Sequence, residues 1–291
     1  MTIDPNTVPA GEAGLTADEF DLLRLLIENE SGIALNDNKR YLLESRLRPV
    51  LAEHRCKTFG QLYTMAKNNS HPLVKQQIVD AITTNETFWF RDKGPFVVLE
   101  EVFMPVAVEL LRKGRMKVRI WSAACSTGQE TYSIAMVIHN YLRKLGDSAI
   151  QPGRFEIVAT DISGEALSIA QLGAYDRFNM QRGLDPENLQ VYFKQNRNFW
   201  IVDPALKKIV DFKSFNLQDS FSSLGCFDVV FCRNVAIYFS QDTKVALFDK
   251  IRNLLSLDGI LFLGSTESMT FLRNSFVTKE YKRFMFYQPG T

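Results

Sequence analysis

The sequence has almost no net charge and few residues of the types that build disulfides. Its 34 Lys and Arg residues nearly balance its 33 Asp and Glu residues, which leaves a net charge of +1. A protein that binds polyanions over its whole surface is therefore not indicated, although a local basic patch is compatible with this balance. The four cysteines, Cys56, Cys125, Cys226 and Cys232, have no paired spacing, so we expect reduced thiols.

Histidines and long apolar runs are also scarce. The three histidines, His54, His71 and His139, are far apart and form no HxH or HExxH pattern, so we expect no metal site. No apolar run reaches the roughly 18 residues that suggest a membrane span. Residues 1–14 lack the basic start and apolar segment of a signal peptide and are expected to form a flexible tail. These absences predict a cytoplasmic protein without direct membrane insertion.

Residues 15–84 show helical periodicity and no strand pattern. A first helix is expected after Thr16, which forms a capping box with Glu19, and this helix should end at Gly32. A second helix should kink or end early at Pro49. Two more short helices follow, so this part of the chain is predicted to be a small all-helical domain.

From residue 117 onward, strand-like and helix-like segments alternate. Strands are expected at "KVRIWSAA", "FEIVATDIS", "KIVDFKSFNL", "FDVVFCRN" and "ILFLGSTES", followed by an antiparallel hairpin. The last helix is expected to run from Gln241 to Gly259. The alternation predicts a parallel sheet with right-handed crossovers, whose ligands bind at the carboxyl ends of the strands. Residues 176–208 are too long for one connection and are expected to form an inserted β-excursion.

A tight turn follows the first of these strands, in "WSAACSTGQETYS". Small residues stand at Ser122, Ala124, Ser126 and Gly128, where a glycine-rich turn would let a ligand approach the backbone closely. No Lys follows, as a phosphate-binding loop requires, so a nucleoside triphosphate is not indicated. The alternative is a turn that only joins a strand tightly to a helix.

Polar residues stand at the carboxyl ends of the later strands. Asp161 could accept hydrogen bonds from both hydroxyls of a ribose, although Asp161 or Ser163 could instead cap a helix. Asn216 and Leu217 would flank an adenine with an amide and an apolar wall. Three polar residues follow the fourth strand, where a ligand could supply their hydrogen-bond partners: Arg233, Asn234 and Tyr238.

Six motifs occur in the order "TTNETFWFRD", "WSAACSTGQETYS", "ATDIS", "FNLQDS", "FCRNVAIYF" and "LFLGSTES". Together they resemble the chemotaxis-receptor glutamate O-methyltransferases, the CheR family, over nearly the whole chain. The resemblance implies an α/β fold of the class I S-adenosylmethionine (SAM) methyltransferase type, a Rossmann-like doubly wound sheet with a small antiparallel β-subdomain. The expected domains are a helical receptor-docking domain over 15–84 and a methyltransferase domain over 85–291, with the β-subdomain inserted at about 176–208.

The resemblance also implies roles for single residues. Arg91 and Tyr238 match the pair that the family places closest to the reacting methyl. The positions expected to contact the cofactor are Asn85, Thr87, Arg91, Ala123, Glu130, Asp161, Ile162, Asn216, Leu217, Arg233 and Asn234. Gln129 and Thr131 depart from the family's "GEEPYS" pattern, but neither departure removes a functional group assigned to the site.

The implied reaction is methyl transfer from SAM to a receptor glutamate, which gives a γ-glutamyl methyl ester and S-adenosylhomocysteine (SAH). A glutamate carboxylate, with an ordinary pKa of about 4.3, is already ionised at neutral pH. Attack on the sulfonium methyl then needs no general base. This agrees with a sequence that offers no catalytic constellation of His or Cys. The enzyme's main contribution would be alignment of the reacting groups.

The implied substrate is the acidic helical bundle of a chemoreceptor's cytoplasmic region. Basic residues of the second helix could dock it, although a solvated helix face is the alternative. These residues are Lys39, Arg40, Arg46, Arg48 and Arg55, with Lys57 beside them. Members of the family that bind a C-terminal receptor peptide carry a glycine-containing loop in the β-subdomain. This chain has no glycine from Val191 to Lys208, so we expect that it does not need a C-terminal pentapeptide tether on the receptor. We also expect a monomer.

Two other functions are compatible with the sequence. One is SAM-dependent methylation of RNA, with the basic helix as the contact to nucleic acid. Enzymes that methylate amino groups tend to carry "NPPY"-like residues after the fourth strand, where this chain has "CRNVAIYF", so we expect no nucleic-acid partner. The other is a module that senses SAM or its product without catalysis, against which the Arg91 and Tyr238 pair argues.

Overall fold

The computed structural model describes residues 14–68, 71–268 and 275–290. The predicted tail over residues 1–14 lies outside this range except for Gly14. Within the described part, no helix is both long enough and apolar enough to cross a membrane.

The chain forms two compact units. The first unit runs to Thr84 and includes the short segments Ile162–Gly164 and Tyr238–Ser240. The second unit contains the rest of the chain, from Asn85 onward.

The described part of the first unit is built from α-helices and one 3-10 turn. Their bounds are α1 (Ala17–Ser31), η1 (Asp37–Lys39), α2 (Arg40–Glu53), α3 (Phe59–Lys67) and α4 (Pro72–Ile82). The capping box predicted for α1 is present, because Thr16 accepts from the Glu19 amide and Glu19 accepts from the Thr16 amide. Gly32 ends the helix in the left-handed conformation, with φ of 77°. Both local predictions for α1 are therefore confirmed.

Of the two expectations for Pro49, a kink or an early end of the helix, the early end is wrong, because α2 continues to Glu53. Proline removes one intrahelical hydrogen bond, here the one to the carbonyl of Ser45. Ser45 is exposed, so water can satisfy that carbonyl. Leu43, Leu47 and neighbouring apolar residues are fully buried in the helical core, and this packing holds the helix together across the proline.

The second unit contains a seven-stranded sheet with strand order β6-β2-β1-β7-β8-β10-β9. The strands are β1 (Val118–Ala123), β2 (Phe155–Asp161), β6 (Val210–Ser214), β7 (Phe227–Cys232), β8 (Leu255–Phe262), β9 (Phe276–Tyr281) and β10 (Phe284–Pro289). The first five in that order pair in parallel, whereas β10 is antiparallel to both β8 and β9. This confirms the predicted parallel sheet and the antiparallel hairpin that follows it.

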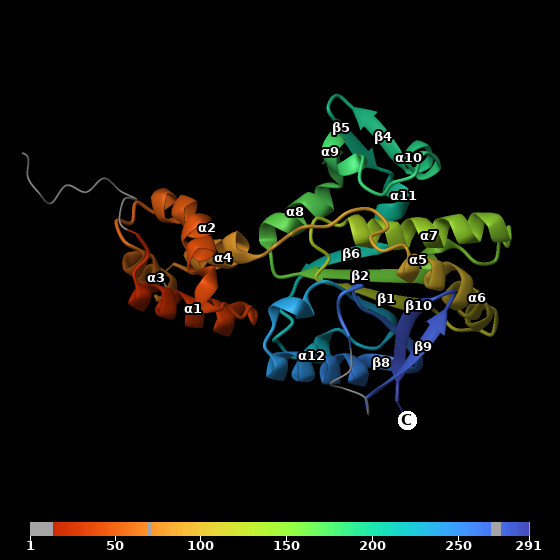
Figure 1. Cartoon of the computed structure of the whole chain (residues 1–291). Coiled ribbons are helices and arrows are strands. Elements are labelled where there is room, and N and C mark those ends of the chain that lie inside the picture. The colour runs from red at the N-terminus through yellow and green to blue at the C-terminus, as the bar shows by residue number, and fades with distance from the viewer. Residues whose placement is uncertain (1–13, 69–70, 269–274, 291) are drawn as a thin grey trace, which may run out of the picture. The chain divides into compact units, whose positions relative to one another are not determined.

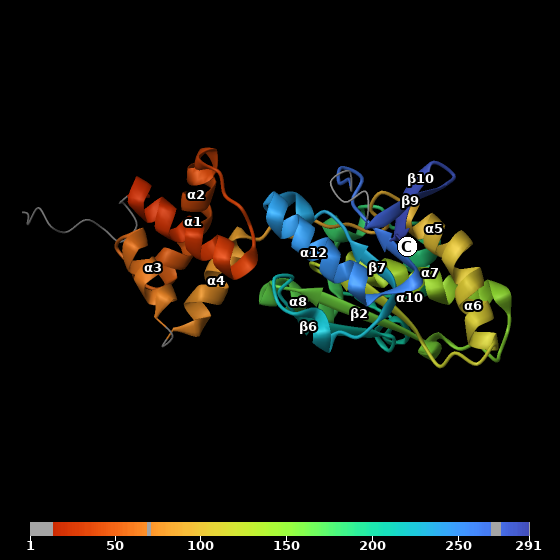
Figure 2. The ribbon, with the colours of Figure 1, turned by 90° about the horizontal axis from the view of Figure 1, so that it is seen from below.

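Helices cover both faces of the sheet. Figure 1 shows α7 on one face and α12 on the other, and Figure 2 shows α12 crossing in front of the strands when seen from below. The helical segments are α5 (Gly94–Val98), η2 (Leu99–Phe103), α6 (Met104–Arg112), α7 (Gln129–Leu145), η3 (Pro152–Arg154), α8 (Gly164–Leu172), α9 (Arg177–Met180), α10 (Pro186–Tyr192), α11 (Pro204–Lys207), η4 (Phe221–Ser223), η5 (Ala236–Tyr238) and α12 (Gln241–Leu254).

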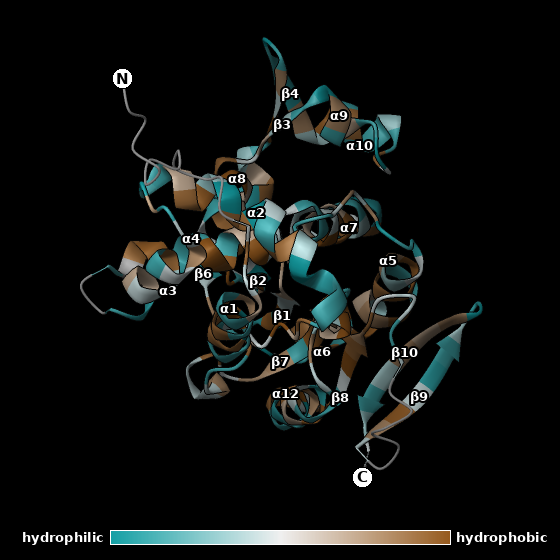
Figure 3. Ribbon diagram, turned by 60° about the vertical axis from the view of Figure 1, so that its left-hand side comes forward, coloured by the Kyte–Doolittle hydropathy of each residue, from teal (hydrophilic) through white to brown (hydrophobic). Residues whose placement is uncertain are grey.

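Helix α12 buries one stripe of residues and exposes another, whereas the first half of α7 is buried almost all round. In Figure 3, hydrophobic and hydrophilic residues share the ribbons of α7 and α12. On α12 the buried positions are Leu247, Phe248, Ile251 and Leu254, spaced three or four residues apart as a helix packed on a sheet requires. The sheet strands between them are almost completely buried, so the carboxyl ends of β1, β2 and β7 are held in a rigid frame.

The predicted boundary between the last helix and the fifth strand is wrong by five residues. We expected a helix to Gly259, but α12 ends at Leu254 and β8 begins at Leu255. Leu255 pairs with Phe227, and the register then shifts before the next pair. Residues 256–259, which were predicted to belong to the helix, lie in this irregular stretch of β8, where Leu257 is 91% exposed.

The inserted β-excursion is a separate three-stranded antiparallel sheet. Its strands are β3 (Ala174–Asp176), β4 (Phe193–Asn196) and β5 (Phe199–Val202), in the order β3-β5-β4. Figure 1 shows this sheet on the α7 side of the main sheet. The predicted small antiparallel subdomain is therefore confirmed.

Candidate active site

The turn between β1 and α7 has a strained backbone at the positions where the sequence has small residues. Ala124, Ser126 and Gly128 all have positive φ, at 58°, 51° and 94°. Gly128 also has no room for a side chain, since an added Cβ would lie 2.9 Å from the Cβ of Ala170 and 3.0 Å from the hydroxyl of Tyr175. Such strain persists only where the surroundings enforce it, and it is common where a backbone holds a ligand.

Asp161 ends β2 beside this turn and is only 6% exposed. Its Oδ2 accepts a hydrogen bond of 2.7 Å from the amide of Ser126. The Ser126 hydroxyl in turn donates to the carbonyl of Asn85, at 2.9 Å. The turn thus connects two positions predicted to contact the cofactor, Asn85 and Asp161.

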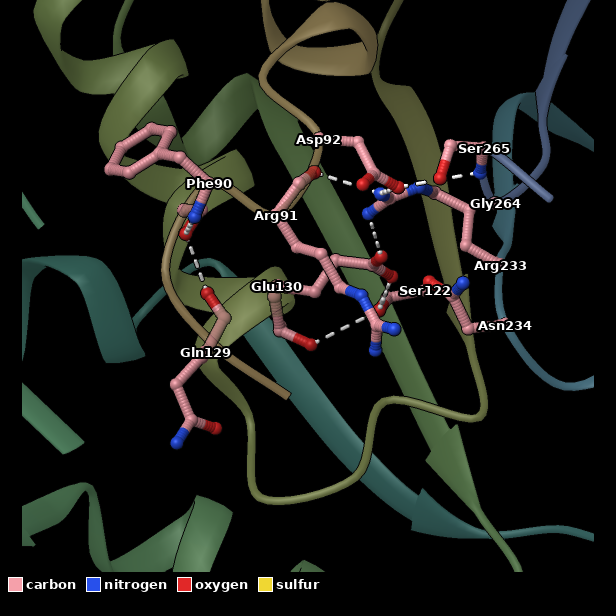
Figure 4. A network of polar contacts seen from close by, with 12 residues as sticks. Phe90, Arg91, Asp92, Ser122, Gln129, Glu130, Arg233, Asn234, Gly264 and Ser265 are labelled. Carbon is pink, nitrogen blue, oxygen red and sulfur yellow. Dashed lines mark hydrogen bonds and ion pairs between the residues drawn. The ribbon is translucent and has the colours of Figure 1, made fainter. Parts of the chain in front are cut away.

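A buried ion-pair network joins the ends of β1 and β7 (Figure 4). The Arg233 side chain is 1% exposed and donates to the carboxylates of Glu130 and Asp92, each at 2.7 Å. It also donates to the carbonyl of Arg91 at 2.7 Å, and Glu130 accepts from the hydroxyl of Ser122 at 2.8 Å. Because a buried guanidinium is costly without partners, these carboxylates fix its position firmly.

The network leaves two buried polar atoms without a hydrogen-bond partner in the described part of the chain, Arg233 Nε and Glu267 Oε1. The other oxygen of Glu267 accepts from the amides of Asn234 and Gly264, both at 2.7 Å. Asn234 has a φ of 58°, which is a strained conformation. Glu267, which comes after β8, holds it there through the bond to the Asn234 amide. Sequence reasoning missed Glu267 and Asp92, although both lie inside motifs that it singled out.

The segment between residues 85 and 93 carries Arg91 and is tightly held. Arg91 donates to the carbonyl of Glu86 at 2.9 Å, and its guanidinium lies 5.4 Å from the ring centre of Phe88. The guanidinium of Arg182, from the β-subdomain, lies 5.1 Å from the same ring and forms an ion pair of 2.8 Å with Glu86. Arg182 was not identified from the sequence.

The loop after β6 begins with a backbone hydrogen bond of 3.0 Å from the Phe215 amide to the Asp161 carbonyl. This bond brings the predicted adenine residues, Asn216 and Leu217, next to the end of β2. Asn216 is partly buried and Leu217 is buried. Ala123, the last residue of β1, is buried and pairs with both Thr160 and Cys232.

For the remaining predicted site residues, the structure gives the position in the chain and the burial. Thr87 is partly buried in the segment that carries Arg91. Ile162 directly follows β2, and Tyr238 is the last residue of η5. Both are partly buried and belong to the segments grouped with the helical unit. The pairing of Arg91 with Tyr238 is therefore still a prediction.

Thiols and phenols near the turn are held in their protonated forms. Burial, together with the charges of Asp161 and Glu130, raises the pKa of Cys125 well above its usual value. Burial and the nearby Glu267 do the same to the pKa of Cys232, and burial raises the pKa of Tyr132. In the described ranges, no group of three or more His, Cys, Asp or Glu side chains could hold a metal.

The predicted docking residues of α2 divide into two classes. Arg46 donates to the carbonyls of Ile82 and Thr83, at 2.6 and 3.1 Å, and Arg40 donates to the Leu15 carbonyl. Arg48 forms an ion pair with Glu44. These three guanidiniums are thus used within the helical unit. By contrast, Arg55 and the neighbouring Lys57 are exposed.

Comparison with known proteins assigns the family. Residues 18–83 match the family model for the CheR methyltransferase all-alpha domain, and residues 85–285 match that for its SAM-binding domain. The chain is 43% identical over 252 residues to chemotaxis protein methyltransferase 1 of Pseudomonas aeruginosa, covering 86% of this chain and 90% of that protein. It is 41% identical over 273 residues to chemotaxis protein methyltransferase Cher2 of Pseudomonas putida, covering 93% and 97%.

The chain also has more distant similarities. The chemotaxis protein methyltransferase of Escherichia coli is 32% identical over 289 residues, covering 94% of this chain and 96% of that protein. Among solved structures, a TehB-like SAM-dependent methyltransferase from Corynebacterium glutamicum covers 63% of this chain and 84% of its own, with 12% identity and a TM-score of 0.35. On the two domain matches and the close relatives, the chain belongs to the CheR family of SAM-dependent chemotaxis methyltransferases.

Proposed function

We propose that this enzyme transfers the methyl group of SAM to glutamate side chains in the cytoplasmic region of chemoreceptors. The observation that carries the proposal is the chemistry around the turn between β1 and α7. Cys125, Cys232 and Tyr132 are held protonated there by burial, so none is suited to remove a proton at neutral pH. An acceptor that arrives already ionised, as a carboxylate does, needs no such base.

The residues of the second unit fit SAM. The buried carboxylate of Asp161 suits a ribose. Gly128 lets the turn pack closely against Ala170 and Tyr175, where a side chain would collide, and so holds the backbone of the turn in place. Asn216 and Leu217 would contact the adenine, and Glu130, Arg233 and Asn234 the methionine end. SAM supplies an electrophilic methyl group on a sulfonium.

Arg91 would position the acceptor carboxylate and Tyr238 would orient it, without proton transfer. The guanidinium of Arg91 is partly buried, so water is partly excluded around it. Its contacts with Glu86 and Phe88 restrict its motion. Charge is neutralised as carboxylate and sulfonium react, so a strong ion pair with the carboxylate would stabilise the ground state too much. A restrained, half-buried arginine can orient the carboxylate while limiting that cost.

The proposed docking surface is the exposed turn that follows α2, where Arg55 and Lys57 face solvent. Arg46 is a poor probe of docking, because its loss would also uncap α4. Reversing Arg55 and Lys57 to Glu should raise the KM for receptor and leave SAM affinity unchanged. Lys39, the last residue of η1, was also predicted to dock and is partly buried. The matched control is therefore reversal of Lys194, an exposed lysine of β4. Equal KM values in all three proteins would favour a solvated helix face.

The proposal is tested with radiolabelled SAM and purified cytoplasmic fragments of chemoreceptors. We expect label on the receptor that base releases as methanol, which identifies a methyl ester. Arg91→Ala and Tyr238→Phe should lower turnover more than they weaken SAM binding, and Arg177→Ala, an exposed arginine of α9, should not. Base-stable label, label on RNA, or SAM binding without transfer would each contradict the proposal.

A further inference from the structure

Lys250 of α12 holds the backbone of the loop that follows β6. Its ammonium donates to the carbonyls of three consecutive residues, Leu217, Gln218 and Asp219, each at 2.9 Å. A lysine ammonium has three protons, so these bonds use all of its donors. The ammonium also lies 4.6 Å from the ring centre of Phe221, which closes its apolar side.

The loop needs such a partner because of its own geometry. The Asn216 side chain accepts from the Gln218 amide at 3.0 Å, and the Asn216 carbonyl accepts from the Asp219 amide at 2.9 Å. This tight turn directs three successive carbonyls toward one point, where they repel one another unless a cation lies between them. Lys250 supplies that cation from a helix anchored in the main sheet by Leu247, Phe248 and Ile251.

We infer that Lys250 is a positioning residue for the cofactor, which acts by fixing the loop that holds the adenine. This inference rests on the proposed placement of the adenine at Asn216 and Leu217. The loop is fixed at its start by the bond from Phe215 to Asp161 and at its centre by Lys250. A loop that is fixed at both points can distinguish purines by the hydrogen-bonding groups on their edges. A mobile loop can adjust to several different purines.

The test compares Lys250→Met with Lys244→Met, a change of another lysine on the same helix. Each protein is titrated by calorimetry with SAH and with S-inosylhomocysteine, whose purine carries an oxygen in place of the amino group. We expect Lys250→Met to bind SAH about tenfold more weakly, as the loss of hydrogen bonds to a charged group implies. The preference for SAH over the inosyl compound should shrink, and amides 216–219 should exchange hydrogen faster. Lys244→Met should match the wild type.

A role in stability alone would lower the melting temperature but leave SAH affinity and purine preference intact, and that result would overturn the inference. If Lys250→Met does not fold, Lys250→Gln keeps a polar group and should show a smaller loss of both properties. Wild-type binding in that variant would also overturn the inference.

Two further controls separate this inference from the proposed function. If Asn216→Ala binds both nucleosides as the wild type does, the adenine lies elsewhere and the inference fails with its premise. If the nucleoside results hold but no receptor is methylated, the inference stands and the proposed substrate is wrong.

Discussion

Asp161 has one structural role that the hydrogen bonds show and a second role that we propose, and a single substitution can separate them. One of its oxygens accepts from the amide of Ser126 at 2.7 Å and so holds the turn between β1 and α7. Its proposed second role is to accept hydrogen bonds from the ribose of SAM. Asparagine keeps one acceptor oxygen for the turn, but its amide nitrogen cannot accept from a hydroxyl.

We therefore expect Asp161→Asn to fold normally and to bind SAH more weakly by about 1.5–3 kcal/mol, the usual effect of losing a hydrogen bond to a charged group. Calorimetric titration with SAH measures this, and thermal unfolding checks the fold. If Asp161 only holds the turn, Asp161→Asn will bind SAH like the wild type and Asp161→Ala alone will show a loss.

At this scale the sequence could indicate some site residues and not others. Asp161, Asn216 and Arg233 could be proposed because each lies at or just beyond the carboxyl end of a recognisable strand. Asp92 and Glu267 could not, because each lies in a loop whose partner comes from a distant part of the chain. Glu267 holds Asn234 through a contact between residues 33 positions apart, which no local pattern reveals.

At the scale of elements, the link between α9 and α10 fastens the β-subdomain to the segment that carries Arg91. The Trp89 amide donates to the Arg182 carbonyl, and the Trp89 ring nitrogen donates to the Asn179 carbonyl, both at 3.1 Å. Gly183 lies directly under this segment with a φ of 87°, and a Cβ added there would approach the Trp89 oxygen to 2.1 Å.

Gly183→Ala should therefore displace the segment around Trp89 and reduce turnover through Arg91. We expect a loss of stability of about 1–3 kcal/mol, from positive φ together with a backbone collision. Gly114→Ala is the matched control, because Gly114 also has a positive φ of 99° but meets no atom within 4 Å. Measuring unfolding free energy and turnover for both separates the conformational cost from the collision. Equal losses in the two variants would mean that the contact with Trp89 is not important.

Element types were more predictable than element ends. The sequence predicts α1 completely, because Thr16, Glu19 and Gly32 mark its ends by local capping. It misplaces the start of β8, because Leu255 joins the sheet by pairing with Phe227, which lies 28 residues earlier in the chain. Likewise, Pro49 stays inside α2 because buried leucines hold the helix, and that packing is a tertiary effect.

At the scale of the whole molecule, buried acidic groups of high pKa make stability depend on alkaline pH. Burial raises the pKa of Cys125, Cys232, Tyr132 and Tyr175 above their ordinary values of 9.0 for a thiol and 10.0 for a phenol. The unfolded chain therefore releases these protons at lower pH than the folded chain does. Their contribution is fully present below about pH 9 and is lost as the pH rises toward the folded pKa values.

We expect the midpoint of urea unfolding to fall between pH 9 and pH 10.5, with each ionising group contributing at most about 1.4 kcal/mol per pH unit. Tyr132→Phe removes one of these groups and should make the fall less steep. A midpoint that stays constant over this range would show that the four groups ionise alike in both states.

At the scale of the whole molecule, the proposed function also depends on how the enzyme would reach a receptor. Addition of a receptor peptide to the β-subdomain would need a strand edge and a loop that receives the peptide. Here β4 has only four residues, and it is joined to β5 by Arg197 and Asn198 alone, with Arg197 at a φ of 54°. A loop this short, without glycine, leaves little surface for a peptide.

We therefore predict that a pentapeptide from a receptor C-terminus does not bind this protein, and that receptors with and without such a tail are methylated at equal rates. Calorimetric titration with the peptide tests the first statement, and methyl transfer to the two forms of one receptor tests the second. We expect this because exposed charges such as Arg55 and Lys57 would bind the receptor bundle directly, without a tail. The KM of the enzyme for the receptor should then rise with salt, because charges are screened over about 8–10 Å at physiological ionic strength. Micromolar binding of the peptide, or slower methylation of the receptor that lacks the tail, would mean that the two-residue turn is sufficient for tethering.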